Sequence, residues 1–593
     1  MKQIYFFLLM LLCFNVFTAE AQIILPDRMY ADTIHSPFVL GVASGDPTES
    51  HVVLWTYVEG ISPGTSKIIT VEVSHQSNFA SIAYTANLSV DSSTSYTIKF
   101  DAGPLNSGTY YYYRFHDNEG NYSVTGRTKT APVGSVSALR FAIMSCSSIY
   151  SGFFNAFARI GERNDIDAVI HLGDYIYDFV DEDEEIRVPN PYPQPPLSLN
   201  DFRTRHAYYL LDPDLRYARQ MHPFIMVWDN HDMAGNEANQ YRGSLQSFHE
   251  WTPVRTPQPF QWDIIYRSFD FGELATLVMT DFETFNGLDS INSSPSAWGD
   301  VQRNWIKYKI SSSNATWKLL GNQKMMGRWS SVGLPDWLNV PGNGIYFDPS
   351  SWDGHVAERL DFFDFLATQS INNVMVLSGD AHITLYTDLT TDPDGLSVYN
   401  PQTGEGAVAV EFLPSSITRG NMDEYGIPLS AGPLLVQGSN NVNPNHVYAE
   451  FFQHGYGIID IKPDSIVAEI WYSPILNIAS EETFHRAYVV RNGENHWRRD
   501  VFIDPLNVLQ SQNNQTSIRI FPNPNNGIFQ LELPNISTAT SIEIFDYALR
   551  KCASYQLEPN QNIATFHLAD FPSGIYILKA GLDIVRIVII DVK

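Results

Sequence analysis

Four segments of the sequence end an apolar run with side chains that can bind metal ions. They read FAIMSCSS, AVIHLGDYIYD, MVWDNHDMAGN and VLSGDAHI. A thiol, a phenol, carboxylates, amides and imidazoles are metal ligands or acid–base groups. In chain order the candidate residues are Cys146, Asp174, Tyr177, Asp229, Asn230, His231, Asn236, Asp380 and His382.

The mixture of donor types indicates more than one kind of ion. Thiolate and phenolate are strongly donating anions that suit ferric iron, so Cys146 and Tyr177 favour iron on one side. Carboxylate and amide oxygens suit hard ions such as calcium. Asp229, Asn230 and Asp380 offer these oxygens.

Each candidate alone has an ordinary structural explanation. A cysteine after a strand is usually a small buried hydrophobe, and Tyr177 alone is more often a packed aromatic. His231 could be a capping or core histidine, and Asp229 or Asp232 could cap the next helix. Ligands in open α/β sheets collect beyond the carboxyl ends of strands. Four strand ends of the same kind therefore favour one shared, polynuclear metal centre.

The elements that must position these residues follow an α/β pattern over residues 139–499. Near-continuous apolar strands alternate with helix-like stretches, which is typical of sheets covered on both faces. The helix-like stretches include GFFNAFARIGERND, LNDFRTRHAYYLL, DVQRNWIKYKISSS and HVAERLDFFDFLATQ. Residues 41–130 instead alternate as short antiparallel strands, which predicts an immunoglobulin- or fibronectin-like sandwich. The last segment is again all-β in its pattern.

The patterns divide the chain into a signal peptide at 1–21, an N-terminal β-sandwich at 22–133, a catalytic domain at 134–500, a linker at 501–514 and a C-terminal β-domain at 515–593. Lys2, a short apolar run and the cleavage site Ala19-Glu20-Ala21 form the export signal. We expect no membrane span after signal removal. The net charge of −28, from 65 acidic and 37 basic residues, makes nucleic acid a poor partner.

Taken in order, SCSS, HLGDYIYD, WDNHDMAGN, SSWDGHVAERL and LSGDAHIT resemble the PhoD-type alkaline phosphatases of the metallophosphoesterase superfamily. GVASGDPTESHVVLWT is similar to the opening of that family's N-terminal β-domain. The resemblance implies an α/β four-layer sandwich of two sheets flanked by helices, between the N-terminal β-sandwich and a small C-terminal one. FPNPNNGIFQLELP and LADFPSGIYILKAG resemble type-nine secretion sorting domains, which implies a secretion-machinery partner and a secreted or cell-surface protein.

The resemblance also implies a role for each motif residue. The ligands of the ferric ion would be Cys146, Asp174, Tyr177 and His382. Asp174 would also face calcium, or another divalent cation, with Asn230 and Asp380. Asp229 and Asn236 lie in the same motif as Asn230, and each would be a ligand or a neighbour of the ligands. We count Asp229 among the catalytic residues. His231 would lie beside the phosphate, where it stabilises charge or protonates the leaving oxygen.

The predicted reaction is hydrolysis of a phosphate ester by a metal-activated water, as in alkaline phosphatase D. The alternatives are a phosphodiesterase or phospholipase with the same site, and a non-catalytic surface binding protein with a vestigial metal site. Three positions depart from the family pattern. Asn230 stands where Asp is expected, Glu283 where Arg is expected, and His355 where Tyr is usual. Glu283 leaves the choice between a monoester and a diester substrate open.

Overall fold

The structure is a computed structural model. It describes residues 29–178, 186–187, 191, 194–233, 238–256, 261–284, 296–330, 348, 350–422, 426–499, 502–503, 519–521, 528–532, 540–546, 551–558, 563–568, 571, 574–580 and 583–589. The chain forms two compact units, Met1–Thr483 with Tyr488–Arg499, and Phe484–Ala487 with Asp500–Lys593. The predicted signal peptide and Asn236 lie outside the described residues. None of the helices within the described ranges is long and apolar enough to cross a membrane.

The helices of the first unit lie mostly between strands, as the α/β pattern predicts. The α-helices are α2 (Asn155–Glu162), α3 (Leu199–Tyr209), α4 (Pro213–Met221), α5 (Ala238–Trp251), α7 (Gly299–Ser312), α8 (Val356–Thr368) and α9 (Gly432–Val442). The 3-10 helices are η1 (Thr33–His35), η2 (Ser92–Thr94), η5 (Trp352–Gly354) and η6 (Leu429–Ala431). The sequence patterns predicted α2, α3, α7 and α8; α4, α5 and α9 were not predicted.

A large mixed sheet in this unit has the strand order β19-β18-β8-β9-β10-β1-β2-β5. Its strands are β19 (Ser465–Tyr472), β18 (Gly455–Ile461), β8 (Leu139–Met144), β9 (Ala168–His171), β10 (Pro223–Met226), β1 (Val42–Gly45), β2 (Val52–Tyr57) and β5 (Thr97–Ala102). Neighbours β8, β9 and β10 are parallel. Their carboxyl ends therefore lie at one edge of the sheet. β20 (Thr483–Arg491) is divided between the two units.

A second sheet has seven strands in the order β11-β12-β13-β14-β16-β15-β17. They are β11 (Arg267–Phe271), β12 (Ala275–Met279), β13 (Trp317–Gly321), β14 (Val374–Leu377), β16 (Ala409–Leu413), β15 (Thr384–Leu389) and β17 (His446–Glu450). β12, β13 and β14 are parallel neighbours. The residues after them are thus also brought to one edge.

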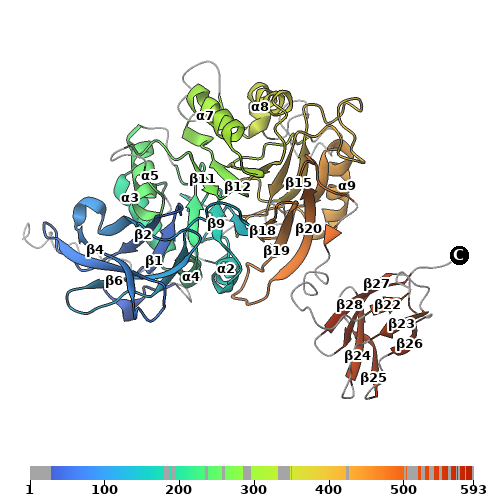
Figure 1. Ribbon diagram of the computed structural model, residues 1–593, viewed down its shortest axis with the longest axis horizontal. Helices are drawn as coiled ribbons and strands as arrows, with labels where there is room; N and C mark the ends of the chain where they lie inside the picture. Colours follow the sequence, from blue (N-terminus) through green and yellow to red (C-terminus); the bar gives the residue numbers. More distant parts are fainter. Residues whose placement is uncertain are drawn as a thin grey trace, which may run out of the picture. The chain divides into compact units, whose positions relative to one another are not determined.

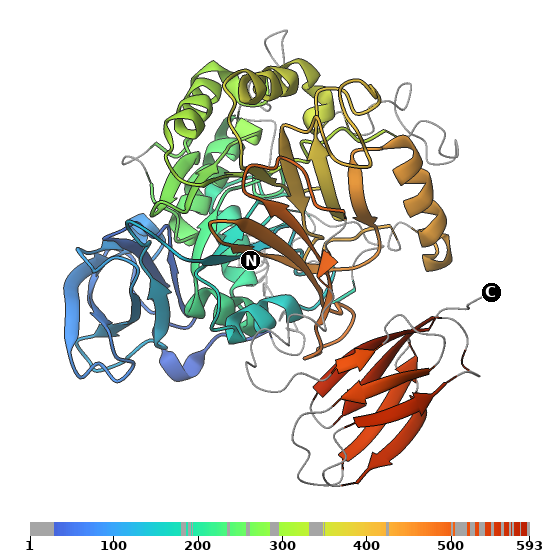
Figure 2. The same cartoon turned by 45° about the vertical axis from the view of Figure 1, so that its right-hand side comes forward.

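The core lies between these two sheets, because alternate residues of each strand face opposite sides. On β12, Leu277 and Met279 join the cluster that also holds Phe141 and Ile143 of β8. Val278 faces the other way, into a cluster with residues of α7 and α8. Figures 1 and 2 show these two helices along the outer side of the second sheet. Each buried side chain of this kind stabilises the fold by about 1.5–3 kcal/mol.

The N-terminal strands divide between two sheets. β3 (Lys67–Ser74), β4 (Ile82–Val90), β6 (Tyr110–Asp117) and β7 (Gly126–Lys129) form a separate sheet with the order β4-β3-β6-β7. β1, β2 and β5 extend the large sheet, and side chains of both sheets share one core. The predicted α/β class with a preceding β-domain agrees with this architecture. The membership of β1, β2 and β5 in the large sheet was not predicted.

The second unit is all-β within its described residues. One sheet has the order β22-β23-β26 and the other β25-β24-β27-β28. The strands are β21 (Phe502–Ile503), β22 (Arg519–Phe521), β23 (Ile528–Glu532), β24 (Thr540–Asp546), β25 (Lys551–Leu557), β26 (Ile563–His567), β27 (Gly574–Ala580) and β28 (Asp583–Ile589). Phe529, Leu531, Ile542 and Ile544 form its core, which agrees with the β pattern of the sequence.

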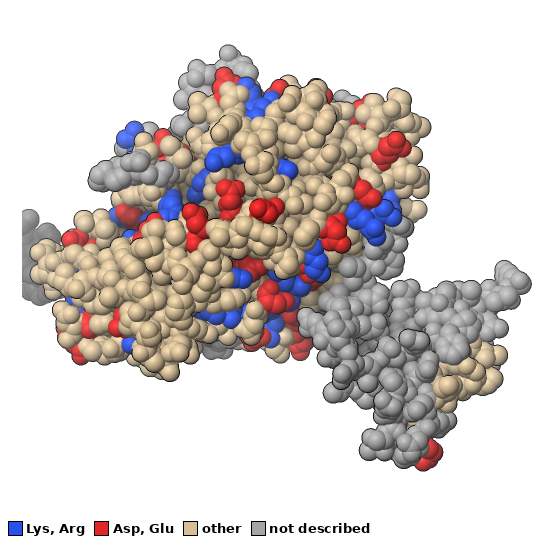
Figure 3. Space-filling model, viewed as in Figure 1, with Lys and Arg blue, Asp and Glu red and all other residues tan. Residues whose placement is uncertain are grey.

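Acidic and basic side chains are mixed on one face of the first unit. On the face drawn in Figure 3, Lys and Arg are interspersed with Asp and Glu. Among the described residues of that face, no large patch of one sign is gathered. Next to the strand ends, by contrast, the carboxylates Asp174, Asp229 and Asp380 lie close together.

Candidate metal centre

Four of the predicted strand ends meet at one place. Cys146 follows β8, Asp174 follows β9, and Asp229 follows β10, all from the large sheet. Asp380 follows β14 of the second sheet. Two groups of ligand atoms, Cys146 with Asp174 and His382, and Asp174 with Asp229 and Asp380, each lie within 4.8 Å. Asp174 belongs to both groups and so links them.

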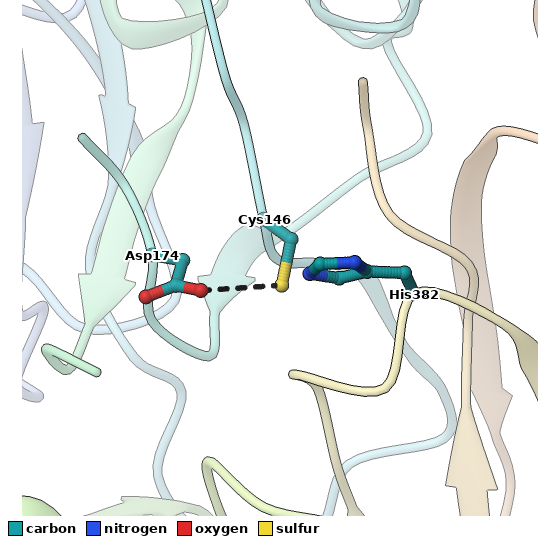
Figure 4. Close-up of side chains that lie close together, drawn as sticks. All are labelled: Cys146, Asp174 and His382. Carbon is teal, nitrogen blue, oxygen red and sulfur yellow. Dashed lines mark hydrogen bonds between the residues drawn. The ribbon is translucent and has the colours of Figure 1, made fainter. Parts of the chain in front are cut away.

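We call Cys146, Asp174, Tyr177 and His382 the thiolate half of the centre. The Cys146 thiol lies 3.8 Å from Asp174 Oδ2, and the Tyr177 hydroxyl donates to the same oxygen at 3.1 Å. Tyr177 Oη is also 3.5 Å from His382 Nε2. His382 Nδ1 is 2.9 Å from the Gly420 carbonyl oxygen, which fixes the ring. Figure 4 shows Cys146, Asp174 and His382 pointing toward one another.

We call Asp229, Asn230 and Asp380 the oxygen half. Its oxygens surround the ammonium of Lys324, a residue that was not predicted as part of the site. Lys324 Nζ lies 2.6 Å from Asp380 Oδ1 and 2.9 Å from Asp229 Oδ1. It donates to Asn230 Oδ1 at 2.7 Å, and Glu283 Oε1 lies 3.5 Å away. The second oxygen of Asp229 is buried and has no hydrogen-bond partner among the described residues.

The backbone of the strand ends is strained at the ligands. Cys146, Asp174, Asp380 and His382 have φ of 58°, 52°, 67° and 57°. For residues other than glycine this left-handed conformation costs about 1–3 kcal/mol each. This conformation turns the backbone sharply away from each strand end. The fold therefore keeps four unfavourable backbone conformations close together.

Gly173 is required by the close approach of two strand ends. Its φ is 112°, and a Cβ on it would lie 2.5 Å from the Asp229 Cβ. A side chain at this position would push Asp174 and Asp229 apart. The glycine before Asp174 therefore lets the two halves share that carboxylate.

The donor set is deeply buried and mostly acidic, which shifts its titration. Burial, and then the charge of Asp174, raise the pKa of Cys146 and of Tyr177 well above their usual values. Burial also raises the pKa of Asp229. Burial alone would lower the pKa of Lys324, but Asp229 and Asp380 outweigh it, so the ammonium stays charged. The thiolate and phenolate forms need a cation beside them, which is the environment that a bound metal ion provides.

His231 lies between the two halves. Its backbone N–H donates to Asp174 Oδ1 at 3.1 Å, and its ring packs at a tilt of 32° against Tyr177, with centroids 4.2 Å apart. Its Nδ1 is 2.7 Å from Asp178 Oδ1. Burial lowers the pKa of His231, but Asp174 and Asp178 raise it more, so the net shift is upward. The imidazolium form is thus favoured beside the ligands.

Two further aspartates were not assigned a role from the sequence. Asp178 orients His231, and its place four residues after Asp174 could have suggested it. Asp232 lies in the motif after β10 and could cap the next helix, and its carboxylate accepts from the backbone N–H groups of Ile176 at 3.0 Å and Asp229 at 2.9 Å. It thereby ties the loop after β9 to the loop after β10. Asp232 supports the ligand loops, because its carboxylate accepts the N–H groups that would otherwise be left unpaired.

The two other departures from the family pattern lie near η5 and β12. Glu283 reaches the oxygen half through Lys324, as given above. His355 is buried next to α8, and its ring packs edge-on against Phe282 with centroids 5.3 Å apart. His355 thus contacts the residue before Glu283.

Comparison with known proteins gives matches over nearly the whole chain. Residues 141–470 match the family described as PhoD-like phosphatase, and residues 26–132 match its N-terminal domain. Residues 519–587 match the secretion system C-terminal sorting domain. The resemblance inferred from the motifs is therefore confirmed.

Two relatives extend this similarity. The chain is 29% identical to "Alkaline phosphatase D" of Bacillus subtilis (strain 168) over 425 residues, which is 65% of this chain and 70% of the Bacillus protein. A solved structure described as "Structure of PhoD" is 26% identical, with a TM-score of 0.68, and the match covers 78% of this chain and 92% of that one. The fold and the family matches agree.

Proposed function

This chain belongs to the PhoD-like phosphatase family, as a phosphoric ester hydrolase, and we propose that it cleaves phosphate esters at the centre described above. The observation that carries the proposal is the convergence of four strand ends on two groups of ligand atoms that share Asp174. The similarity to alkaline phosphatase D supports a phosphoric ester as the substrate class.

The donor types of the thiolate half fit the ferric ion that the resemblance implies. The oxygen half offers oxygens of the type that calcium or another divalent cation would take, but the ammonium of Lys324 lies among them. The raised pKa values of Cys146 and Tyr177 and the unpartnered oxygen of Asp229 support a cation at this place. Bound cations would polarise the phosphoryl oxygens and lower the pKa of the water that attacks phosphorus.

The residues of the chain then divide the remaining work. The thiolate half is buried except for a half-buried His382, whereas Asn230 is exposed and His231 and Asp380 are half-buried. A phosphate ester therefore approaches from the side of these three residues. His231, held by Asp178, donates a proton to the leaving oxygen or balances the charge that develops there. Lys324 places a fixed positive charge beside the phosphoryl group.

We propose that the C-terminal β-domain, 515–593, is an address read by the type-nine secretion machinery. The match to a sorting domain supports this proposal. The protein would then be secreted or held at the cell surface, after export through the signal at 1–21. We also propose that residues 134–500 form a catalytic domain with a four-layer sandwich. Residues 22–133 would have an immunoglobulin-like topology.

One experiment separates the proposed reaction from its alternatives. Purified full-length protein is assayed on p-nitrophenyl phosphate and on bis-p-nitrophenyl phosphate, and its metals are measured. Turnover of the monoester that falls with Asp174→Asn supports the phosphatase. Faster turnover of the diester would make the protein a phosphodiesterase. No turnover of either substrate would favour the non-catalytic binding protein.

A further inference from the structure

Lys324 fills the coordination space of the oxygen half. Its ammonium has three N–H groups, and three oxygens lie within hydrogen-bond distance, on Asp380, Asn230 and Asp229 at 2.6, 2.7 and 2.9 Å. Asp380 and Asn230 are residues that the family resemblance offers to a divalent cation, and Asp229 lies in the same motif as Asn230. The side chain of Lys324 is 4% exposed, so the ammonium is cut off from bulk water.

The position of Lys324 is fixed by its neighbours. Asn322 donates from Nδ2 to the Lys324 carbonyl oxygen. The Gln323 carbonyl accepts from the Gly379 N–H at 2.9 Å, which joins this segment to the segment that carries Asp380. On the other side, the N–H of Met326 donates to Glu411 at 2.6 Å. Lys324 is thus built into the strand ends in the same way as the ligands are.

An ordinary buried ion pair does not account for this arrangement. A single carboxylate would neutralise the ammonium, and burying further carboxylates beside it costs free energy. Here one ammonium faces the charges of Asp229, Asp380 and Glu283 together. Asn230, which stands where the family pattern has Asp, removes one negative charge from the same group. The group therefore carries less negative charge than the family pattern would give it, which weakens its hold on a divalent cation.

We propose that Lys324 takes the place of a second divalent cation, so that the centre operates with one metal ion in the thiolate half and one ammonium in the oxygen half. This inference rests on the proposed function, because it assumes a phosphate ester between the two charges. The lysine would supply the charge for a phosphoryl oxygen as a point charge on a fixed stem. A chelator would be able to remove only the ion of the thiolate half.

The test counts metal ions in the full-length protein. Wild type, Lys324→Ala, Lys324→Arg and a control, Lys318→Met, are equilibrated with calcium chloride, dialysed, and analysed by elemental mass spectrometry. Lys318 lies on β13, the strand that precedes Lys324, and its Nζ donates to the Ala315 carbonyl. Calorimetric titration with calcium, and with magnesium for comparison, gives the affinity of each variant.

We expect one tightly held ion per chain in wild type, Lys324→Arg and Lys318→Met. Lys324→Ala should bind calcium as a second ion, at least about 100-fold more tightly than wild type, because a positive charge has left the site. Its melting temperature without calcium should fall, since buried carboxylates lose their partner, and calcium should restore it. The melting temperature of wild type should not respond to calcium.

Two tightly held ions in wild type would overturn the inference, and so would one ion in a folded Lys324→Ala. If Lys324→Ala does not fold, the ion count of wild type still decides. Turnover on the two p-nitrophenyl substrates is measured on the same samples. One ion without turnover would contradict the proposed function, whereas two ions with turnover would contradict only the role of Lys324.

Discussion

The thiolate half and the oxygen half are both built from strand ends, yet different groups lie next to their negative charge. In the thiolate half, a sulfur, a phenol and an imidazole surround Asp174, and the guanidinium of Arg419 lies at the face of the Tyr177 ring, 5.3 Å from its centroid. In the oxygen half, the ammonium of Lys324 lies among the donor atoms themselves.

The difference shows that ligand-type residues do not by themselves fix how many ions a site holds. Two sheets bring similar strand ends together. The ammonium of Lys324, which follows one of these strands, changes what Asp229, Asn230 and Asp380 can bind. In the proposed centre the thiolate half needs an external ion, whereas the oxygen half already contains the positive charge of Lys324. Variants in each half should therefore fail in different ways.

Removing the sulfur of the thiolate half should have the largest effect. Cys146→Ala should lose the bound metal ion and lower kcat/KM on p-nitrophenyl phosphate by more than about 100-fold. Removing a ligand should cost more activity than removing a residue that only orients a ligand. Elemental analysis and initial rates measure both quantities. Cys552→Ala is the matched control, since Cys552 is an exposed cysteine on β25. Full activity and metal content in Cys146→Ala would refute the assignment of the thiolate half.

Removing His231 should lower the rate without changing the ion count. His231→Gln should reduce kcat by about 100-fold, the contribution typical of a general acid. Metal content should stay at the wild-type value, because the contacts of this ring are with Asp178 and Tyr177. His35→Gln is the control, because His35 forms a similar pair with Asp32 at 2.7 Å. Loss of metal in His231→Gln would instead make His231 a ligand.

A smaller effect is expected when the charge of the oxygen half is changed at Glu283. Glu283→Gln removes one negative charge 3.5 Å from Lys324 Nζ. It should raise kcat/KM for the dianionic monoester relative to the monoanionic diester by about 3–10-fold. Asp300→Asn, at an exposed residue of α7, is the control. An unchanged ratio would show that Glu283 does not influence the choice of substrate.

Much of the centre was predictable because strand ends are local features. An apolar run that stops at a polar residue marks the end of a buried strand, and Cys146, Asp174, Asp229 and Asp380 all follow this rule. Lys324 follows it too, after β13, but an ammonium group is not a metal ligand, so the pattern gave no reason to place it among the carboxylates. Its role depends on contacts with residues 94 and 56 positions away, as the separations of Asn230 and Asp380 show.

The fold was predictable at the level of class and less so in its connections. The alternation of strands and helices gave the α/β unit, and short alternating strands gave the β-domain before it. The pairing of β1 with β10 joins residues 44 and 223, and a local pattern carries no information on such a pairing. Strand β4, with half of its residues toward solvent, has too weak an apolar signal to be recognised.

The smallest effect is expected at a lysine–carboxylate pair outside the centre, which serves as a comparison for Lys324. Lys67 Nζ lies 2.8 Å from Asp117 Oδ2 in the N-terminal sheet. Burial alone would raise the pKa of Asp117, but hydrogen bonds from Lys67 and Asn121 lower it to about 2. The folded carboxyl thus has a lower pKa than the unfolded one. Its contribution to stability is present above the unfolded pKa and is lost as the pH falls toward 2.

Asp117→Asn should therefore lower the free energy of unfolding by about 1 kcal/mol at pH 6, because solvent screens a pair of this kind. The difference from wild type should shrink as the pH falls below 4, which urea unfolding at several pH values would measure. Turnover and metal content should not change, in contrast to Lys324→Ala, because this pair contacts no ligand. If Asp117→Asn altered the ion count, the separation between a structural lysine pair and a lysine that replaces a cation would fail.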